Sequence, residues 1–314
     1  MKLVSLVTPC FNEEENVDQL YERVRAVFAG LPQYDYEHIY IDNHSTDATV
    51  AKVKALAARD HRVKLIVNAR NFGHIRSPVH ALLQARGDAV IIMASDLQDP
   101  PELITEFVAR WEEGFKVAVA VKSGSRESLA MWLIRLGYYK LLGAISEVKL
   151  LENYTGYGLY DRVVVEAVRK TDDRYPYFRG LIPDLGFEIA RIPFQQPTRF
   201  RGVTKNNFFT LYDMAMLGIT SHSRVPIRIA TMGGFLLAIG CMLISLGYFV
   251  WKLLHWNSFE FGLAPLLIGL FFFMSVNLFF LGLIGEYVGA IHTQTLKRPL
   301  VVEQERVNLD DERG

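Results

Sequence analysis

Cysteine is scarce in this chain: its 314 residues include only Cys10 and Cys241. Two cysteines make neither a disulfide framework nor a metal-ligand spacing, and their scarcity suits a reducing compartment. An excess of charge is also lacking, because 34 basic residues balance 34 acidic ones. Without a basic excess, the chain lacks the positive charge that is typical of nucleic-acid-binding proteins. Residues 1–11 lack the apolar stretch of a cleavable signal, and no internal repeat or low-complexity segment is visible.

Long uncharged apolar runs, by contrast, are present twice. Residues 229–251 and 261–285 each exceed the roughly 18 to 20 residues that cross a bilayer core of about 30 Å. Two buried core helices are the alternative, but a soluble domain rarely needs two uncharged helices of this length side by side. Small residues in the first run let helices approach closely, as membrane packing favours. We therefore predict a transmembrane hairpin, with helices over residues 226–252 and 261–288.

The charges that flank the two runs predict their orientation. Arg224 and Arg228 precede the first run, and Lys297 and Arg298 follow the second, whereas the connection at 252–260 is nearly neutral. Because Lys and Arg concentrate on the cytoplasmic side, both termini are expected in the cytoplasm, with the protein in the inner (cytoplasmic) membrane. The C-terminal tail spans 289–314, and its charged end, 303–314, has little to bury, which predicts disorder.

The soluble part, residues 1–205, alternates segments of strand and helix character. Apolar runs predict strands and helical spacing predicts helices, in the order strand 3–8, helix 14–28, strand 38–41, helix 46–58, strand 63–67, helix 77–85 and strand 89–93. This order is typical of an α/β domain with a mostly parallel sheet and helices on both faces. Ligands of such sheets bind beyond the carboxyl ends of the strands. We therefore expect the site in loop 1 (residues 9–15), loop 2 (42–47), loop 3 (68–76) and loop 4 (95–101).

Loops 1 and 2 carry side chains that fit either a binding role or helix capping. In loop 1, Asn12 and the carboxylates after it are expected to cap the next helix. In loop 2, Asp42 at a strand end could accept hydrogen bonds from a uracil N–H or a ribose hydroxyl. Ser45 and Asp47 precede the next helix, so capping is again the alternative.

Loops 3 and 4 carry complementary chemistry. Arg70 and Arg76 surround Gly73 in loop 3, a composition suited to a turn that holds an anion. Oxygen ligands follow the next strand directly in loop 4, at Asp96, Gln98 and Asp99. Such hard ligands suit Mg²⁺ or Mn²⁺ bridging a diphosphate. One loop of this kind is weak evidence, but four in the expected order are strong evidence for a site that binds a nucleoside diphosphate.

Longer motifs extend this pattern over nearly the whole chain. They read VTPCFNEEENV, IDNHSTDAT, NARNFG, DLQDPPELI, FRGLIPDLGF, RFRGVTK and GEYVGAIHTQTLKRPL. With these motifs the chain resembles the inverting GT-A glycosyltransferases of family 2, specifically the membrane-anchored polyprenyl-phosphate glycosyltransferases related to dolichyl-phosphate mannose synthase and bactoprenol glucosyltransferase.

The resemblance implies a fold and an activity. The fold is a GT-A (Rossmann-like, mostly parallel sheet) catalytic domain over residues 1–205. The activity is inverting, metal-dependent transfer of a sugar from a nucleotide sugar, UDP-hexose or a GDP-sugar, to undecaprenyl phosphate at the cytoplasmic face, for cell-envelope glycan synthesis or modification. Family members also suggest a homo-oligomer, a tetramer.

The resemblance also assigns roles by position. Donor binding falls on Pro9, Phe11, Glu13, Asp42 and Asp96, and metal binding on Asp96 and Gln98. The loop chemistry described above adds Arg70 and Arg76 to donor binding and Asp99 to metal binding. Acceptor-phosphate binding falls on Lys122, Arg126, Arg179, Arg199, Arg201 and Lys205, with residues 122–128 resembling a mobile loop that closes over both substrates. The catalytic set is Asp96, Arg179, Arg201 and Lys205.

Two departures from the family pattern concern the chemistry. The usual Asp-Ala-Asp metal turn is Ala94-Ser95-Asp96 here, and Gly156 stands where many relatives carry an acid that is a candidate base. Glu152 and Asp161 flank Gly156 and are either substitute bases or surface carboxylates. A polyprenyl phosphate has a second pKa near 6, so it is already nucleophilic at neutral pH and needs little help from a base.

Residues 206–225 place apolar side chains at helical spacing directly before the first apolar run. Their place favours an interfacial helix that lies on the lipid headgroups, and an ordinary core-facing helix is the alternative. Two other function classes compete. A processive polysaccharide synthase is disfavoured by the missing Gln-x-x-Arg-Trp motif and the small number of spans. A non-catalytic sugar-nucleotide-binding subunit is suggested by Ala94 and Gly156.

Overall fold

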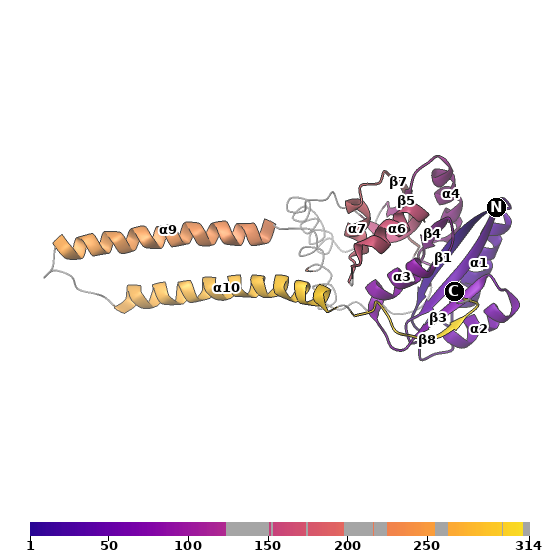
Figure 1. Ribbon diagram of the computed structural model, residues 1–314, viewed down its shortest axis with the longest axis horizontal. Coiled ribbons are helices and arrows are strands. Elements are labelled where there is room, and N and C mark those ends of the chain that lie inside the picture. Colours follow the sequence, from indigo (N-terminus) through magenta and orange to yellow (C-terminus); the bar gives the residue numbers. More distant parts are fainter. Residues whose placement is uncertain are drawn as a thin grey trace.

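The computed structural model describes residues 1–123, 151, 153–173, 175–197, 216, 225–254, 263–296 and 298–309. An α/β domain lies at one end, and two long helices project from it side by side (Figure 1). Several predictions fall outside the described residues and stay predictions. They concern Arg126, Glu152, Arg199, Arg201, Lys205 and the helix at 206–225, of which only Met216 and Val225 are described.

The sheet has a parallel centre. Strands β1 (Lys2–Cys10), β2 (Tyr34–Asp42), β3 (Val63–Asn68) and β4 (Ala89–Ile92) pair in parallel, in the order β4-β1-β2-β3. Strand β6 (Tyr154–Asp161) runs antiparallel beside β4, followed by β5 (Val117–Lys122) and β7 (Ile189–Phe194). The four predicted strands are therefore confirmed, and so is the α/β class with a mostly parallel sheet.

Helices cover both faces of this sheet, as predicted. Apolar side chains of α1 (Val17–Ala29), α2 (Thr49–Arg59) and α4 (Ile104–Glu112) fill one core, and the short turn η1 (Pro101–Leu103) leads into α4. The opposite core holds side chains of α3 (Gly73–Gln84), α6 (Arg162–Thr171) and α7 (Phe178–Asp184). Continuously buried strands such as β1, which is buried from Val4 to Thr8, follow from this double cover.

One local prediction is wrong, the capping role of Asn12. Helix α1 begins at Val17 after Asn16, and Asn12 lies before it with a positive φ of 57°. The Asn12 side-chain oxygen instead accepts a hydrogen bond from the backbone N–H of Thr46 at 2.8 Å. A partner in loop 2 therefore displaces the local capping contact, and α1 starts later than the helix predicted from 14.

The predicted disorder of the charged tail is also wrong for its described residues. Residues Glu303–Val307 form strand β8, which pairs antiparallel with β3 at the edge of the sheet. The backbone groups along the edge of β3 supply partners that the tail's own composition does not reveal. Its charges are paired as well, since Glu305 lies 2.6 Å from Lys54 of α2 and Glu303 bonds His80 of α3.

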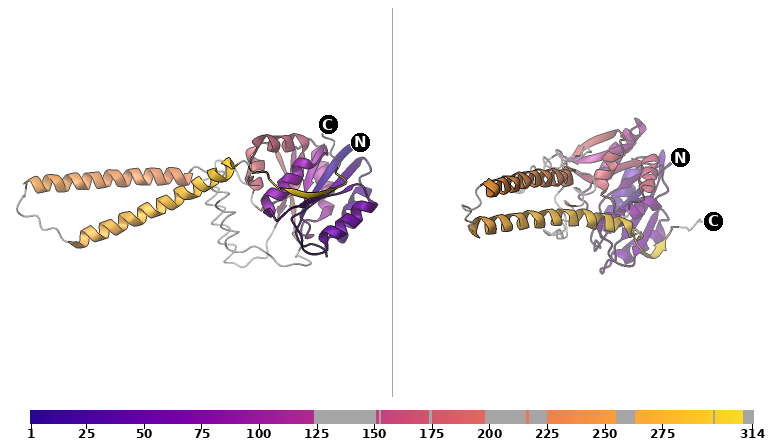
Figure 2. Two further views of the ribbon diagram at one scale, coloured as in Figure 1. Left: turned by 60° about the horizontal axis from the view of Figure 1, so that its bottom comes forward. Right: turned by 60° about the vertical axis from the view of Figure 1, so that its left-hand side comes forward.

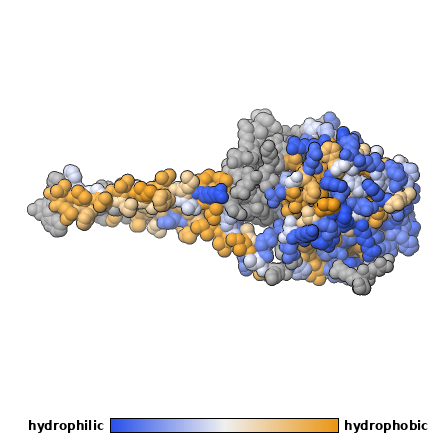
Figure 3. All heavy atoms as spheres, turned by 45° about the horizontal axis from the view of Figure 1, so that its top comes forward, coloured by the Kyte–Doolittle hydropathy of each residue, from blue (hydrophilic) through white to orange (hydrophobic). Residues whose placement is uncertain are grey.

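Helices α9 (Val225–Leu254) and α10 (Leu263–Thr295) correspond to the two apolar runs. Segments Val225–Trp251 and Gly269–Thr295 are long and apolar enough to cross a membrane, with mean hydropathies of 2.1 and 1.7. The apolar stretches of both helices are not buried within the structure. Apolar side chains accordingly cover the outside of both helices (Figure 3). The alternative of two buried core helices is therefore wrong for these segments.

Candidate functional site

The carboxyl ends of the four parallel strands bring the four predicted loops to one edge of the sheet. Strands β1 and β2 end in register, with Cys10 opposite Asp42. Loop 4 contacts the end of β1 through the Ser95 hydroxyl, which donates to the carbonyl of Pro9 at 3.0 Å. Burial raises the pKa of the Cys10 thiol well above its ordinary value, and the charge of Asp42 adds to this effect. Cys10 is therefore an inert part of the site's floor rather than a nucleophile.

Loops 1 and 2 interlock through backbone-to-side-chain hydrogen bonds. The backbone N–H of Glu13 donates to the Thr49 hydroxyl at 2.8 Å, and the N–H of Asn12 donates to the Ser45 hydroxyl at 2.9 Å. Asp42 is 1% exposed, and its two carboxylate oxygens accept from the N–H and the hydroxyl of Ser45. These contacts hold Asp42 and Glu13 in place, which is what preorganised recognition of a nucleoside requires.

Asn43 connects loop 2 to loop 3, and sequence reasoning missed it. Its side-chain oxygen accepts from the N–H of Phe72 at 2.8 Å and from the amide of Asn68 at 3.2 Å. Its own amide donates to the carbonyl of Gly73 at 3.1 Å. The sequence offered only an asparagine directly after an apolar strand, and the structure adds that its amide is buried and therefore has to satisfy several hydrogen bonds.

Loop 3 holds two positive charges close together. The guanidinium groups of Arg70 and Arg76 lie 4.1 and 5.2 Å from the ring centroid of Phe72. Burial lowers the pKa of Arg76 below its ordinary value, and the charge of Arg70 lowers it further. Two like charges held against one ring repel each other, so an anion bound between them would relieve that repulsion.

Loop 4 holds two carboxylates in different surroundings. Asp99 is buried, and its Oδ2 accepts from the N–H of Ala94 at 3.0 Å. Burial, followed by the nearby charge of Asp96, raises the pKa of Asp99 to about 6. Asp96 accepts from the N–H of Gln98 at 3.2 Å across the tight turn at Leu97, whose φ is 60°. Asp99 thus secures the turn in which Asp96 lies.

Positive groups from distant elements complete this part of the site. The charges of Lys122, at the end of β5, and of Arg179, in the first turn of α7, both act on Asp99. The charge of Arg179 also adds to burial in lowering the pKa of His74, at the start of α3. The charges of Asp96, Lys122 and Arg179 therefore all act on Asp99 in the folded chain. His74 is a further neighbour that sequence reasoning missed.

Strand β6 explains why no acid stands at Gly156. Gly156 has a φ of 98°, a conformation that L side chains rarely adopt. A Cβ on Gly158 would lie 2.6 Å from the carbonyl oxygen of Ala118, so the close approach of β5 also requires glycine there. The spacing of these two glycines therefore serves the sheet.

Asp161 has a structural role, which contradicts its use as a substitute base. Its carboxylate accepts from the indole N–H of Trp111 at 2.8 Å, from the Lys116 ammonium at 3.0 Å and from the backbone N–H of Val163 at 2.9 Å, where it caps α6. Burial alone would raise the pKa of Asp161, but these hydrogen bonds lower it below its ordinary value. A carboxylate so engaged is a poor proton acceptor.

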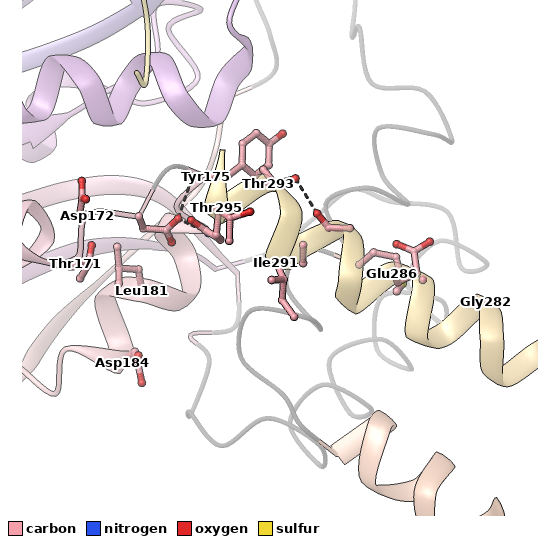
Figure 4. Close-up of a pocket in the computed structure, with 16 residues that line it drawn as sticks. Thr171, Asp172, Tyr175, Leu181, Asp184, Gly282, Glu286, Ile291, Thr293 and Thr295 are labelled. Atoms are coloured by element: carbon pink, nitrogen blue, oxygen red, sulfur yellow. Dashed lines mark hydrogen bonds between the residues drawn. The ribbon is translucent and has the colours of Figure 1, made fainter. Parts of the chain in front are cut away.

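A hollow of about 1010 Å³ separates α6 and α7 from α10 (Figure 4). Its lining includes four carboxylates, Asp172, Asp173, Asp184 and Glu286. The side-chain amide of Gln294 on α10 donates to Asp173 at 2.6 Å and so ties α10 to the α/β domain. Carboxylates disfavour a phosphate, so this hollow differs in character from the cationic side of the site.

Comparisons with known proteins identify the family. The family model described as Glycosyl transferase family 2 matches residues 5–169. A prophage bactoprenol glucosyl transferase homolog of Escherichia coli is 32% identical over 302 residues, covering 94% of this chain and 96% of that protein. An uncharacterized glycosyltransferase of a Synechocystis species is 32% identical over 301 residues, covering 95% and 93%. Glucosyl-3-phosphoglycerate synthase from Mycobacterium tuberculosis, solved with Mn²⁺, UDP-glucose and phosphoglyceric acid, is 20% identical, with a TM-score of 0.45 and coverage of 70% and 78%.

Proposed function

This chain belongs to glycosyl transferase family 2, and from that premise we propose that it transfers a hexose from a nucleotide sugar to a polyprenyl phosphate at a membrane surface. The observation that carries the proposal is the length of chain over which the similarity to membrane-lipid glycosyltransferases extends. Similarity to bactoprenol glucosyl transferases covers 94% of the chain and so reaches both exposed apolar helices. An acceptor that is itself a membrane lipid explains why the catalytic domain carries this hairpin.

The donor is proposed to bind across loops 1 to 3. Asp42, with Pro9, Phe11 and Glu13 beside it, would contact the base and the ribose, and Arg70 and Arg76 would meet the diphosphate. Support comes from the fixed carboxylate of Asp42 and from the two guanidinium groups stacked on the ring of Phe72. We propose a UDP-hexose as the donor, with Asp42 accepting the N–H of uracil, and a GDP-sugar is the alternative because guanine offers N–H groups to the same carboxylate.

The residues of loop 4 fit a divalent cation in part. Among the described residues, no group of three or more His, Cys, Asp or Glu side chains is placed to hold a metal ion. Asp96 and Gln98 nonetheless offer oxygen ligands of the kind that Mg²⁺ and Mn²⁺ prefer, and diphosphate oxygens would supply others. We assign metal binding to Asp96 and Gln98, while Asp99 secures the turn. When bound, the ion would neutralise charge on the departing diphosphate.

The nucleophile is proposed to be the acceptor phosphate itself. One of its oxygens forms the bond to the anomeric carbon while the bond to the nucleoside diphosphate breaks, so a single displacement inverts that carbon. Cations have to offset the repulsion between the two anionic substrates. Arg179 and Lys122 lie near Asp99 in this site, and Arg126, Arg199, Arg201 and Lys205 are predicted to join them.

The membrane arrangement follows from the same proposal. With both apolar helices spanning the bilayer, the α/β domain, its site and both termini would lie in the cytoplasm, as the flanking Arg and Lys residues indicate. Cysteine labelling in intact cells tests this topology: residues 253–259 should react from outside, and residue 314 should not. A tetramer, suggested by the family resemblance, can be checked by light scattering in detergent.

The decisive experiment incubates the purified full-length chain with undecaprenyl phosphate and radiolabelled UDP- or GDP-sugars. We expect a labelled lipid from one donor, formed only with Mg²⁺ or Mn²⁺ and lost when EDTA is added. Asp96→Ala is the matched negative control. Donor binding without labelled lipid or free sugar from any donor would instead favour the non-catalytic sugar-nucleotide-binding subunit suggested by Ala94.

A further inference from the structure

The segment that follows α10 returns to the α/β domain. We call residues 298–309 the C-terminal strap. It leaves the end of α10, passes α3 and ends in β8 beside β3 (Figure 2). Asn308 completes the attachment, because its amide donates to the carbonyls of Ala57 and Val63 at 2.8 and 2.9 Å. The strap thereby connects the membrane hairpin to the edge of the catalytic sheet.

Much of the strap contacts loop 3 and α3. The backbone N–H of Ala69 donates to the carbonyl of Val302 at 2.9 Å, and the guanidinium of Arg76 donates to the carbonyl of Pro299. Val302 and Pro299 therefore hold both ends of the loop in which the donor diphosphate is proposed to bind. The strap supplies these contacts with backbone oxygens, whose positions depend on how its side chains anchor it.

Glu303 is a largely buried anchor of β8. Its carboxylate accepts hydrogen bonds from His80 of α3 and from Arg306. The side chains of Glu303 and His80 are only 16% and 17% exposed. Burial raises the pKa of Glu303, but the hydrogen bonds from His80 and Arg306 lower it to about 2 overall. Glu303 is therefore charged across the physiological range.

We propose that the C-terminal strap is a positioning element of the donor site, in which Glu303 acts through His80 to hold α3 and loop 3 in the geometry that binds the sugar nucleotide. This inference rests on the proposed function, since it assigns the donor diphosphate to loop 3. Helix α3 starts at Gly73 and carries both Arg76 and His80. A shift of α3 at His80 consequently moves the guanidinium of Arg76.

A purely structural role for β8, closing the edge of the sheet, makes a different prediction. It would treat all anchors of β8 alike, whereas the positioning role separates Glu303 from Glu305. Glu305 lies on the same strand but pairs with Lys54 of α2, and both of these side chains are more exposed, at 44% and 40%. Glu305→Ala is therefore the matched control for Glu303→Ala.

The test uses the full-length chain in detergent and measures the Kd for UDP and the donor KM and kcat. Glu303→Ala should raise both the Kd and the KM about tenfold and change kcat less than about twofold. Glu303→Gln, which keeps a hydrogen-bond acceptor, should recover most of the affinity. Glu305→Ala should leave all three values unchanged. Equal effects of Glu303→Ala and Glu305→Ala, or a loss confined to kcat, would overturn the proposal.

His80 supplies an independent check. If Glu303 acts through His80, then His80→Ala should weaken UDP binding about as much as Glu303→Ala, and the double variant should be no weaker than either. Additive losses would refute the proposed route. GDP replaces UDP throughout if it is the nucleotide that binds.

Hydrogen exchange separates this inference from the proposed function. In Glu303→Ala, the amide of Ala69, which donates to the strap, should exchange about tenfold faster, while the amides of β1 keep their rates. That measurement requires no substrate. If no lipid is labelled by the wild type but nucleotide affinity and exchange respond as described, the positioning role stands and the proposed acceptor fails. If exchange at Ala69 is unchanged, the positioning role fails whatever the activity.

Discussion

Replacing Asp161 separates a structural carboxylate from a catalytic one. Its carboxylate caps α6 and accepts hydrogen bonds from Trp111, Lys116 and Val163, and its side chain is only 11% exposed. Asp161→Ala removes all of these contacts, whereas Asp161→Asn keeps one acceptor oxygen in a side chain of nearly the same shape. The two variants should therefore differ in stability more than in chemistry.

The expected loss of stability follows from the three contacts. Leaving the buried indole N–H of Trp111 without an acceptor costs about 1–3 kcal/mol, and losing the N-cap of α6 costs about 1 kcal/mol. The ion pair adds little, because the Lys116 side chain is 46% exposed. We expect Asp161→Ala to lower the free energy of unfolding by about 3 kcal/mol, and Asp161→Asn by about half of that.

Urea unfolding of the α/β domain, followed by circular dichroism of the full-length chain in detergent, measures this loss. The transfer rate per folded molecule is measured in parallel, and Asp161→Asn should keep it within about threefold. Because the pKa of Asp161 is lowered in the folded state, its contribution is present above about pH 4 and lost as pH falls through the folded pKa. The stability difference between wild type and Asp161→Asn should shrink accordingly below pH 4. If Asp161→Asn abolishes transfer at unchanged stability, Asp161 is a catalytic base after all.

Further predictions concern the chemistry and the sheet. Asp96→Ala should retain less than a tenth of wild-type transfer at saturating metal, which corresponds to a barrier raised by at least about 1.4 kcal/mol. Asp99→Asn should lose less activity, because its side chain can still accept the hydrogen bond from Ala94. Similar losses of the two variants in radiolabel assays would contradict the metal assignment. The transfer rate should fall below about pH 6, as the lipid phosphate gains its second proton. Asp99 has a pKa of about 6 as well, so the pH profile of Asp99→Asn distinguishes the two groups. The fall in rate below pH 6 should persist in this variant, and a flat profile would show that Asp99 causes the fall. Gly158→Ala should lower the free energy of unfolding by about 1–3 kcal/mol, because the new Cβ would lie 2.6 Å from a β5 carbonyl; an unchanged urea midpoint would contradict this.

The strand ends were predictable because two local signals coincide there. Apolar runs identify β1 to β4, and the parallel order of such runs places their carboxyl ends at one edge of the sheet. Asp42 and Asp96 could therefore be assigned to one site from the sequence alone. Their hydrogen-bond partners could not, because Ser45 and Gln98 become partners only through the turns of the folded loops.

Long-range neighbours were beyond the sequence for a different reason. His74 and Arg179 are electrostatic neighbours in the folded chain, although more than a hundred residues separate them. No periodicity in the sequence records that Arg179 of α7 comes near His74 at the start of α3. Asn12 shows the same limit at short range, since capping preference predicts its local role and a tertiary partner, Thr46, overrides it.

The strap shows where composition-based reasoning fails. Residues 303–307 are mostly charged and alone could not offset the entropy of ordering, which is why disorder was predicted. Strand β3, however, presents an edge of backbone donors and acceptors, and the strap that follows α10 reaches this edge through contacts with loop 3 and α3. Tethering at both sides lowers the entropy cost of pairing. The order of the strap therefore depends on the position of α10, and a change that moves α10 relative to β3 should loosen loop 3 as well.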